Sequence, residues 1–292
     1  MVNRAKKLRQ AIEGEKCVLA VGVYDGLSCL IAHQLGFEAA VMGGYPTSAA
    51  KLGRPDVGLL TMSEMVSHLQ YLSDAADIPI IADADTGYGN PVNVVRTVKE
   101  YERAGAAAIL LEDQVSPKKC GHMSGKQVIP AQEYVEKLKA ALDARNDRDL
   151  IIIARTDARA VNGFEDALER ACIYCEAGAD MTFVEAPISM EELSAVPAKV
   201  KCPQVANMIE GGKTPFLSID ELSMLGFKVA FYTLGVQYAV AKTLQTYMSH
   251  LLRNGTTSGY EGGMMNFVEF NKLVGLEDVR ALEKKYTAAK DD

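Results

Sequence analysis

The segment from Glu112 to Gln127, EDQVSPKKCGHMSGKQ, concentrates reactive and charged side chains directly after an apolar run. Within it, Cys120 follows two lysines and precedes His122 by two positions. Neighbouring cations lower the pKa of a thiol, and the thiolate is the reactive form. Gly121 and Gly125, which follow the cysteine, would let the segment move. The pattern predicts either an inert loop cysteine or a thiol of near-neutral pKa that acts as a general acid or base when a loop closes.

A second group of candidate residues consists of carboxylates. DADTG places Asp83 and Asp85 two positions apart, so that on one strand both would face the same side. Asp56 and Glu112 can join them. Like charges so close need a cation, and oxygen ligands favour Mg²⁺, with Mn²⁺ as an alternative. Because Mg²⁺ keeps several waters, some of these carboxylates could act through water. The alternative interpretation is helix capping or surface ion pairing.

Arg155 ends another apolar run, in the motif ARTDA. Its planar guanidinium suits a substrate carboxylate. Alternatively, Arg155 could form a structural ion pair with Glu185 or Asp157, and the two roles are compatible. Two further motifs give weaker indications of function. The CIYC motif at residues 172–175 has metal-site spacing but lies within a helical pattern and has no second ligand pair, which favours core packing. IEGGKTP, at residues 209–215, could form a phosphate loop.

The candidate residues lie in a chain whose predicted strands and helices alternate regularly. Eight short runs are nearly uniformly apolar until their ends, which is typical of strands buried on both faces. They lie at residues 17–23, 38–44, 78–85, 106–113, 149–156, 180–187, 203–208 and 228–233. Amphipathic helical patterns separate them, for example at residues 63–76, 91–105, 131–144 and 164–178.

The alternation predicts an α/β fold, a closed (β/α)8 TIM barrel, with an open doubly wound sheet as the alternative. No GxGxxG motif follows the first strand, which argues against a dinucleotide-binding version. In such a barrel, the active site lies at the carboxyl ends of the strands, where the polar candidates fall. We expect one domain over residues 1–292, with a helical C-terminal tail from about residue 235.

The bulk composition narrows the class of partner. The 292 residues are 48% hydrophobic and 24% charged, as in a soluble globular protein. The net charge of −7 is spread over mixed acidic and basic residues, so we expect no nucleic-acid partner. No apolar run is long enough for a membrane span, and no signal peptide is expected at the N-terminus. Six cysteines are too few for a disulfide scaffold, which favours a cytoplasmic location.

Taken together, the motifs DADTGYGN, EDQVSPKKCGH, ARTDA, FVEAP and NMIEGGKTP resemble those of the isocitrate lyase and phosphoenolpyruvate mutase superfamily. The resemblance extends from about Arg9 to Tyr286. It implies a (β/α)8 barrel whose last helix is exchanged with a neighbouring subunit, usually in a homotetramer, with residues 235–253 and the tail supplying the exchange. It also implies that Asp83 and Asp85 hold Mg²⁺, while Asp56 and Glu112 act largely through water.

The same resemblance implies roles for the remaining site residues. Main-chain donors of Gly43, Gly44 and Tyr45 would bind the pyruvyl carboxylate, with Gly43 in place of the usual serine or threonine. Arg155 would bind and polarise the substrate, and Cys120 would protonate the carbon of the leaving enolate. The other substrate-binding residues implied are Lys118, Gly121, His122, Glu185, Asn207 and Thr233.

The branch of the superfamily is indicated by the loop and by the tail. Lyases that break a carbon–carbon bond carry the KKCGH cysteine, whereas phosphonopyruvate-type mutases and hydrolases typically lack it. Methylisocitrate lyases usually carry an arginine where Tyr238 stands and another in the tail, which here reads GGMMNFVEFNKLVGL. Without these cations a third carboxylate would be unpaired, which is costly. The tail resembles the dimethylmalate lyase and oxaloacetate hydrolase branch.

The leading hypothesis is therefore a Mg²⁺-dependent lyase that cleaves a 2-hydroxy dicarboxylate, such as 2,3-dimethylmalate, by retro-aldol chemistry to pyruvate and a second carboxylate. Tyr45 and a metal-bound water are the candidates for the base that deprotonates the hydroxyl group. The alternatives are 2-methylisocitrate lyase, oxaloacetate hydrolase and a phosphonopyruvate-acting mutase or hydrolase. From a different class, the chain could be a non-catalytic barrel that only binds a dicarboxylate.

Overall fold

A computed structural model describes residues 3–287 of the chain, and its central feature is a closed barrel of eight parallel strands. Each strand pairs with the next along the chain, and β1 pairs with β8 to close the ring. The strands are β1 (Val18–Gly22), β2 (Ala39–Met42), β3 (Ile80–Asp83), β4 (Ala108–Glu112), β5 (Ile151–Thr156), β6 (Met181–Val184), β7 (Gln204–Asn207) and β8 (Val229–Tyr232). The closed barrel confirms the predicted fold over the open sheet.

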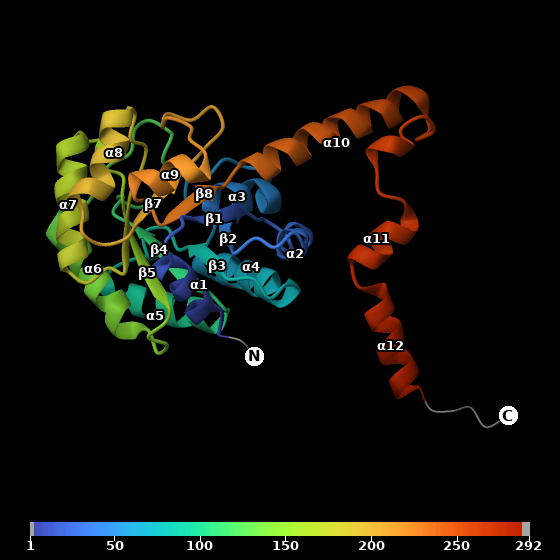
Figure 1. Cartoon of the computed structure of the whole chain (residues 1–292), viewed down its shortest axis with the longest axis horizontal. Coiled ribbons are helices and arrows are strands. Elements are labelled where there is room, and N and C mark those ends of the chain that lie inside the picture. Colours follow the sequence, from blue (N-terminus) through green and yellow to red (C-terminus); the bar gives the residue numbers. More distant parts are fainter. Residues whose placement is uncertain (1–2, 288–292) are drawn as a thin grey trace. The chain divides into compact units, whose positions relative to one another are not determined.

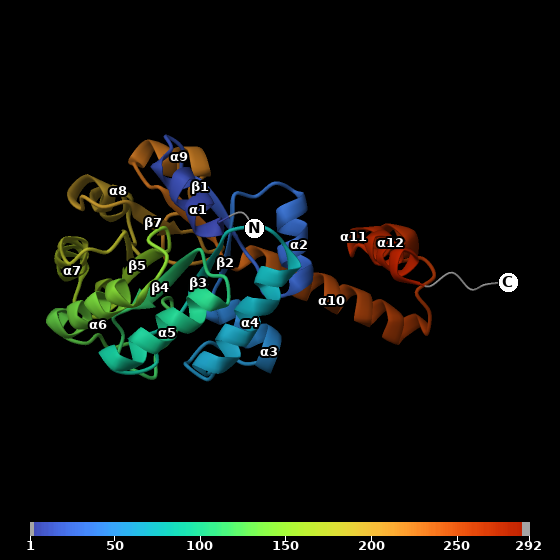
Figure 2. The ribbon, with the colours of Figure 1, turned by 90° about the horizontal axis from the view of Figure 1, so that it is seen from below.

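Helices surround the strands, as Figures 1 and 2 show from two directions. Before the tail they are α1 (Arg4–Glu13), α2 (Gly26–Gln34), α3 (Gly44–Leu52), α4 (Met62–Ala75), α5 (Pro91–Arg103), α6 (Ala131–Ala144), α7 (Phe164–Glu176), α8 (Met190–Lys199) and α9 (Ile219–Leu225). Several begin at capping boxes, among them α4 at Thr61, α5 at Asn90 and α9 at Ser218. In each, the cap side chain and the residue three positions on satisfy backbone donors at the helix start.

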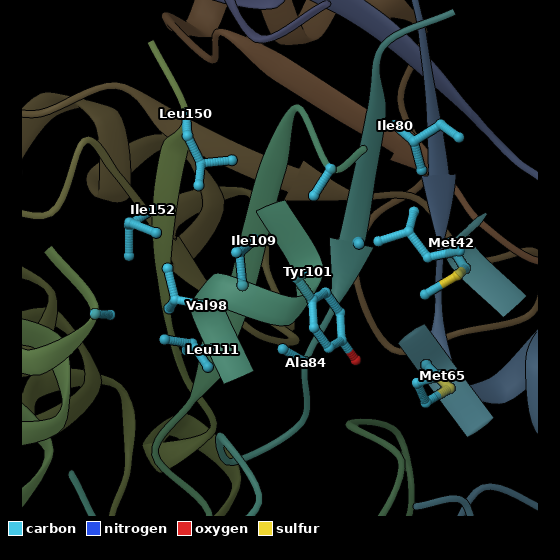
Figure 3. Packing of buried hydrophobic residues seen from close by; sticks show 14 of the residues in the cluster. Met42, Met65, Ile80, Ala84, Val98, Tyr101, Ile109, Leu111, Leu150 and Ile152 are labelled. Atoms are coloured by element: carbon cyan, nitrogen blue, oxygen red, sulfur yellow. The ribbon is translucent and has the colours of Figure 1, made fainter. Parts of the chain in front are cut away.

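The strands are buried on both faces because two apolar layers enclose them. Inward-facing side chains such as Ile81, Ile153 and Phe231 fill the barrel. Side chains on the opposite face of the strands pack against the helices, as Figure 3 shows for Ile80 and its neighbours. In this outer layer, the Tyr101 hydroxyl of α5 donates to the Asp83 carbonyl at 3.0 Å, which fixes the end of β3.

The chain divides into two compact units, one that holds the barrel and a second that begins at Tyr238. The helices of the second unit are α10 (Gly235–Asn254), which begins in the barrel unit, α11 (Phe267–Leu273) and α12 (Leu276–Tyr286). None of the residues of these three helices is buried. Large apolar side chains are therefore exposed, including Leu252 and Phe267, which are 87% and 83% accessible. Of the helices described, none has the length and apolarity needed to cross a membrane.

Candidate active site

The carboxylates predicted at the strand ends do lie close together, but Asp85 is placed there by a turn and not by the strand itself. Strand β3 ends at Asp83, so Asp85 lies beyond the strand, in a turn with a φ of +48°. Its N–H donates to Asp83 Oδ1 at 2.9 Å, and its carbonyl accepts from Glu112 N at 2.9 Å. The turn, rather than strand alternation, therefore brings the two carboxylates together, and that part of the prediction was wrong.

Lys118 lies among these carboxylates and is almost fully buried. Its Nζ is 2.7 Å from Asp56 Oδ2 and 2.9 Å from Asp85 Oδ1. One ammonium does not balance the cluster. Burial, with the nearby Asp83 and Asp56 charges, raises the pKa of Asp85 to about 6 even though Lys118 opposes the shift. Burial likewise raises the pKa of Glu112 well above its ordinary value.

The oxygen atoms of this cluster fit a hard cation. Glu112 Oε1 is buried without a hydrogen-bond partner, and Asp85 Oδ1 has the Lys118 ion pair but no hydrogen bond. Over residues 3–287, no three histidine, cysteine, aspartate or glutamate side chains converge as a direct metal-binding set. A cation with few protein ligands and several waters, such as Mg²⁺, matches this arrangement.

The first turn of α3 presents main-chain donors to the same place. Gly43 caps the helix, and the Gly44 N–H donates to Asp83 Oδ2 at 2.9 Å. A Cβ on Gly44 would lie 2.8 Å from Lys118 Nζ, so a larger residue would displace the Lys118 ammonium from its present position. The free N–H groups of a helix N-terminus attract anions. Tyr45, half-buried, lines the cavity beside them.

Cys120 lies in the loop between β4 and α6 and lines the cavity, but its surroundings differ from the prediction. Its N–H donates to the Asp56 carbonyl at 3.1 Å. Burial raises the pKa of the Cys120 thiol, because the loop excludes water and the Glu185 and Asp56 charges add to the effect. The expected near-neutral pKa was wrong, since Lys118 is paired with carboxylates and Lys119 Nζ donates to Gly125 O. The thiol is therefore protonated at neutral pH.

The next two loop residues contact the carboxylate that follows β6. A Cβ on Gly121 would lie 2.5 Å from Arg155 Nη2 and 2.6 Å from Glu185, so glycine is required there. His122 Nε2 lies 3.0 Å from Glu185 Oε1, and His122 Nδ1 accepts from Lys213 N at 3.2 Å. These contacts assign the ring proton to Nε2. The glycine-rich segment around Lys213 thus supports the loop.

Arg155 has the structural partners that were one of its two predicted uses. Its Nε donates to Asp157 Oδ2 at 2.8 Å and its Nη2 donates to Asp157 Oδ1 at 3.1 Å. Glu112 Oε2 and Glu185 Oε2 lie 3.4 and 3.5 Å from the guanidinium, which also stacks 5.3 Å above the Phe183 ring. Arg155 is held rigidly by these contacts and still lines the cavity.

Polar side chains from the last two strands complete this wall. Asn207, the last residue of β7, donates from Nδ2 to Glu185 Oε2 at 3.4 Å. Thr233 directly follows β8 and donates from Oγ1 to Asn207 Oδ1 at 3.2 Å. The chain of contacts from Thr233 to Glu185 therefore continues to Arg155.

One cavity collects most of the residues predicted from the sequence. They are Gly43, Gly44, Tyr45, Asp56, Asp83, Lys118, Cys120, Gly121, His122, Arg155, Glu185, Asn207 and Thr233. Asp85 and Glu112 are reached through their contacts with Lys118 and Arg155. The sequence did not point to the apolar part of the wall, which includes Ile209, Phe231 and Leu234.

Three polar residues near this cavity were missed as well. Gln114 and Lys126 are buried at the base of the loop, and Asp157 was weighed only as a partner for Arg155. A buried carboxamide and ammonium are unusual inside a loop, but burial is not readable from the sequence. The CIYC cysteines, Cys172 and Cys175, are partly buried against an apolar cluster on α7, as the core-packing interpretation predicted.

The barrel and this arrangement of carboxylates, arginine and loop cysteine define an enzyme of the lyase type. Residues 8–252 match the family described as phosphoenolpyruvate phosphomutase, and the chain belongs to that family. The superfamily suggested by the sequence motifs is thereby confirmed.

Two curated relatives are similar over nearly the whole chain. The 2,3-dimethylmalate lyase of Eubacterium barkeri is 46% identical over 99% of this chain and 100% of its own length. The 2-methylisocitrate lyase of Aeropyrum pernix is 44% identical over 93% of this chain and 87% of its own.

Two solved structures are also similar. Oxaloacetate acetylhydrolase, in complex with 3,3-difluorooxalacetate, superposes with a TM-score of 0.92 at 32% identity, covering 99% of each chain. Phosphonopyruvate hydrolase, in complex with oxalate and Mg²⁺, does so with a TM-score of 0.88 at 29% identity, covering 98% of this chain and 99% of the other.

Proposed function

We propose that this enzyme cleaves the C2–C3 bond of a 2-hydroxy dicarboxylate of the 2,3-dimethylmalate type, releasing pyruvate and a second carboxylate. The observation that carries the proposal is the place of Cys120, which lines the same cavity as Arg155 and the carboxylates Asp56 and Asp83, with a thiol pKa raised by burial. A retro-aldol cleavage needs charge stabilisation on one fragment and a proton donor for the carbon of the other. The cavity supplies both.

Substrate binding uses fixed donors at one end of the cavity. The first turn of α3 offers the main-chain N–H of Tyr45 to the pyruvyl carboxylate, while the Gly44 N–H beside it is bound to Asp83 Oδ2. Arg155, locked by Asp157, offers its remaining donors to the oxygen at C2. When bound, Mg²⁺ would add positive charge at the forming carbonyl, and Asp83, Asp85, Asp56 and Glu112 would hold it.

Bond cleavage then follows a balanced transfer of electrons and protons. Loss of the proton from the C2 hydroxyl, for which Tyr45 is the candidate base, drives formation of the pyruvate carbonyl as the C2–C3 bond breaks. The electron pair of that bond stays on C3 as a carboxylate-stabilised carbanion. Cys120 Sγ donates its proton to C3. A thiol with a raised pKa is present in the required acid form at neutral pH.

The cavity wall supports a substrate with two carboxylates rather than three. Within the cavity lining described, the permanently cationic side chains are Lys118 and Arg155, and both already have carboxylate partners. Ile209 and Leu234 are apolar and match methyl substituents. A third carboxylate facing such a wall would lose hydration without gaining a partner. The 2-methylisocitrate lyase activity is therefore the second candidate.

The assembly and location belong to the same proposal. We infer that the chain is one domain over residues 1–292 that functions as a homotetramer, with α10 and the helices after it exchanged between subunits. The exposed apolar side chains of the tail support this inference. Cytoplasmic location is supported by the six cysteines, all of which are free thiols.

The test compares three substrates in one assay. The chain is incubated with 2,3-dimethylmalate, 2-methylisocitrate or oxaloacetate, with Mg²⁺ or with excess EDTA. Pyruvate is measured for the first two substrates and oxalate for the third. We expect Mg²⁺-dependent pyruvate release that is fastest from dimethylmalate. Replacement of the acid, Cys120→Ser, lowers kcat by at least about 100-fold.

Cys172→Ser is the matched control, because Cys172 is a half-buried cysteine on α7 outside the cavity. It leaves kcat within twofold. Full turnover by Cys120→Ser would contradict the assignment of Cys120 as the acid. Faster cleavage of methylisocitrate would overturn the two-carboxylate argument. Tight oxalate binding with no turnover of any substrate would favour a binding protein instead.

A further inference from the structure

The loop that carries Cys120 has a firm base. Val115 N donates to Gln127 O at 2.8 Å, and Gln114 and Val128 form an antiparallel bridge. Between these anchors the loop extends over the cavity, so its tip needs other contacts to hold a defined place. Two buried polar side chains supply them, one on each side of Cys120.

Gln114 holds the residue before Cys120. Its Oε1 accepts from Lys119 N at 2.9 Å, and its Nε2 donates to Lys119 O at 2.8 Å. A single carboxamide therefore satisfies both backbone groups of Lys119. Gln114 is 1% exposed, so water does not compete for these bonds. Only a side chain with both a donor and an acceptor can make this pair of contacts.

Lys126 holds the residue after Cys120. Its Nζ donates to Gly121 O and also to Asp157 Oδ1, the latter at 2.9 Å. The Lys126 side chain is 1% exposed and that of Asp157 is fully buried. The Asp157 carboxylate is the same group that accepts two hydrogen bonds from Arg155. One carboxylate thus joins the loop tip to the arginine of the cavity.

We propose that Gln114 and Lys126 are positioning residues that hold the Cys120 thiol over the cavity. Lys126 also links loop closure to the orientation of Arg155 through Asp157. Neither residue lines the cavity, so both act through their neighbours. The proposal rests on the role proposed for Cys120.

The burial of Lys126 explains why its contact favours the closed loop. A buried ammonium is costly unless hydrogen-bond acceptors surround it. Gly121 O is an acceptor only while the loop tip lies in its present place. If the loop lifts away, Lys126 loses that acceptor and keeps only Asp157. In the present position of the loop both acceptors are in place, so the hydrogen bond to Gly121 O favours the closed loop.

The test measures loop position directly. Cys120 is alkylated with iodoacetamide at fixed pH in the intact chain, and modification of each cysteine is followed by peptide mass spectrometry. Cys172, on α7, serves as an internal reference for global loosening. We expect Lys126→Met to raise the Cys120 rate at least fivefold and to leave the Cys172 rate unchanged.

Two further variants complete the design. Lys119→Met is the matched control, because Lys119 is in the same loop and donates to Gly125 O but is half-exposed. Its Cys120 rate stays within twofold of the wild type. Gln114→Glu keeps the size of the side chain but removes the donor to Lys119 O. It raises the Cys120 rate as Lys126→Met does, and it keeps the proposal testable if that variant fails to fold.

Steady-state kinetics give the second readout. With whichever substrate the wild type cleaves, Lys126→Met lowers kcat at least tenfold and changes KM less than threefold. Unchanged Cys120 alkylation in both variants would overturn the proposal. A parallel rise at Cys120 and Cys172 would do the same, because it would indicate general loosening. Since alkylation needs no substrate, a wild type without turnover would contradict the proposed function and leave this test intact.

Discussion

At the scale of single residues, the site depends on two glycines whose missing side chains leave room for charged groups. The Gly121 position lies against the Arg155 guanidinium and the Glu185 carboxylate. The Gly44 position lies against the Lys118 ammonium. At both, the missing side chain is what allows a loop or a helix start to approach charged groups closely.

Replacement of the loop glycine tests this directly. In Gly121→Ala the added Cβ would lie 2.5 Å from Arg155 Nη2, so the loop cannot close in its present form. We expect kcat/KM for pyruvate release to fall at least about 100-fold. Gly26→Ala is the control, since its Cβ meets only Ala75 at 3.5 Å, an ordinary contact. Equal activity of the two variants would show that closure tolerates a side chain at residue 121.

The protonation state of Cys120 gives a second prediction at this scale. Burial raises the thiol pKa, so the acid form persists through neutral pH and the thiolate appears only at alkaline pH. Difference absorbance at 240 nm between the wild type and Cys120→Ser, followed from pH 6 to 10.5, measures the thiolate. We expect little signal below pH 8.5, the ordinary cysteine range. A midpoint near neutrality would contradict the role of Cys120 as the acid.

At the scale of elements, β4, β5 and α7 are joined behind the cavity by one carboxylate. Asp113 accepts from the Thr156 hydroxyl at 2.7 Å, the Tyr174 hydroxyl at 2.8 Å, Arg170 Nη1 at 3.2 Å and Asp157 N at 2.9 Å. Asp113 directly follows Glu112, so the network also fixes the end of β4, where a carboxylate of the site is placed.

Loss of this carboxylate leaves several buried donors without a partner. We expect Asp113→Ala to lower the free energy of unfolding by about 3 kcal/mol, because the Thr156 and Tyr174 hydroxyls and the Asp157 N–H would lose their buried acceptor. Urea denaturation at fixed protein concentration measures the change. Glu136→Ala, which removes an exposed partner of Lys139, provides the comparison and changes stability little. A similar loss of unfolding free energy in both variants would show that the Asp113 network contributes no more to stability than an exposed ion pair.

The elements were predictable because their patterns are local. Apolar runs and helix caps such as Asn90 depend on neighbours in sequence, and the eight strands and α6 formed where the patterns placed them. The surroundings of Cys120 were not predictable, since Lys118 and Lys119 precede it in sequence but direct their ammonium groups to Asp56 and Gly125. Adjacent residues in a loop need not have adjacent side chains.

At the scale of the whole molecule, the tail carries apolar surface that a single chain does not cover. Leu252 on α10 and Phe267 on α11 are among the most exposed large apolar residues of the described chain. Exposed apolar surface of this kind is typical of an interface between subunits. The proposed tetramer would cover it.

Light scattering coupled to gel filtration tests the assembly. We expect the wild type to have the mass of four chains, and the double variant Leu252→Glu, Phe267→Glu to dissociate toward smaller species. Met224→Glu on α9 changes an equally exposed but separate residue and keeps the wild-type mass. A monomeric wild type would rule out the exchange of helices.

The division of the cavity wall has a consequence for how such an enzyme acquires new substrates. The charged groups that act on the pyruvyl end come mainly from residues 43–157, whereas Ile209, Thr233 and Leu234 come from the last third of the barrel. Mutations in that later stretch of the gene can reshape the pocket for the departing fragment without disturbing the ion pairs that break the bond. Specificity can therefore diversify while the chemistry is inherited intact.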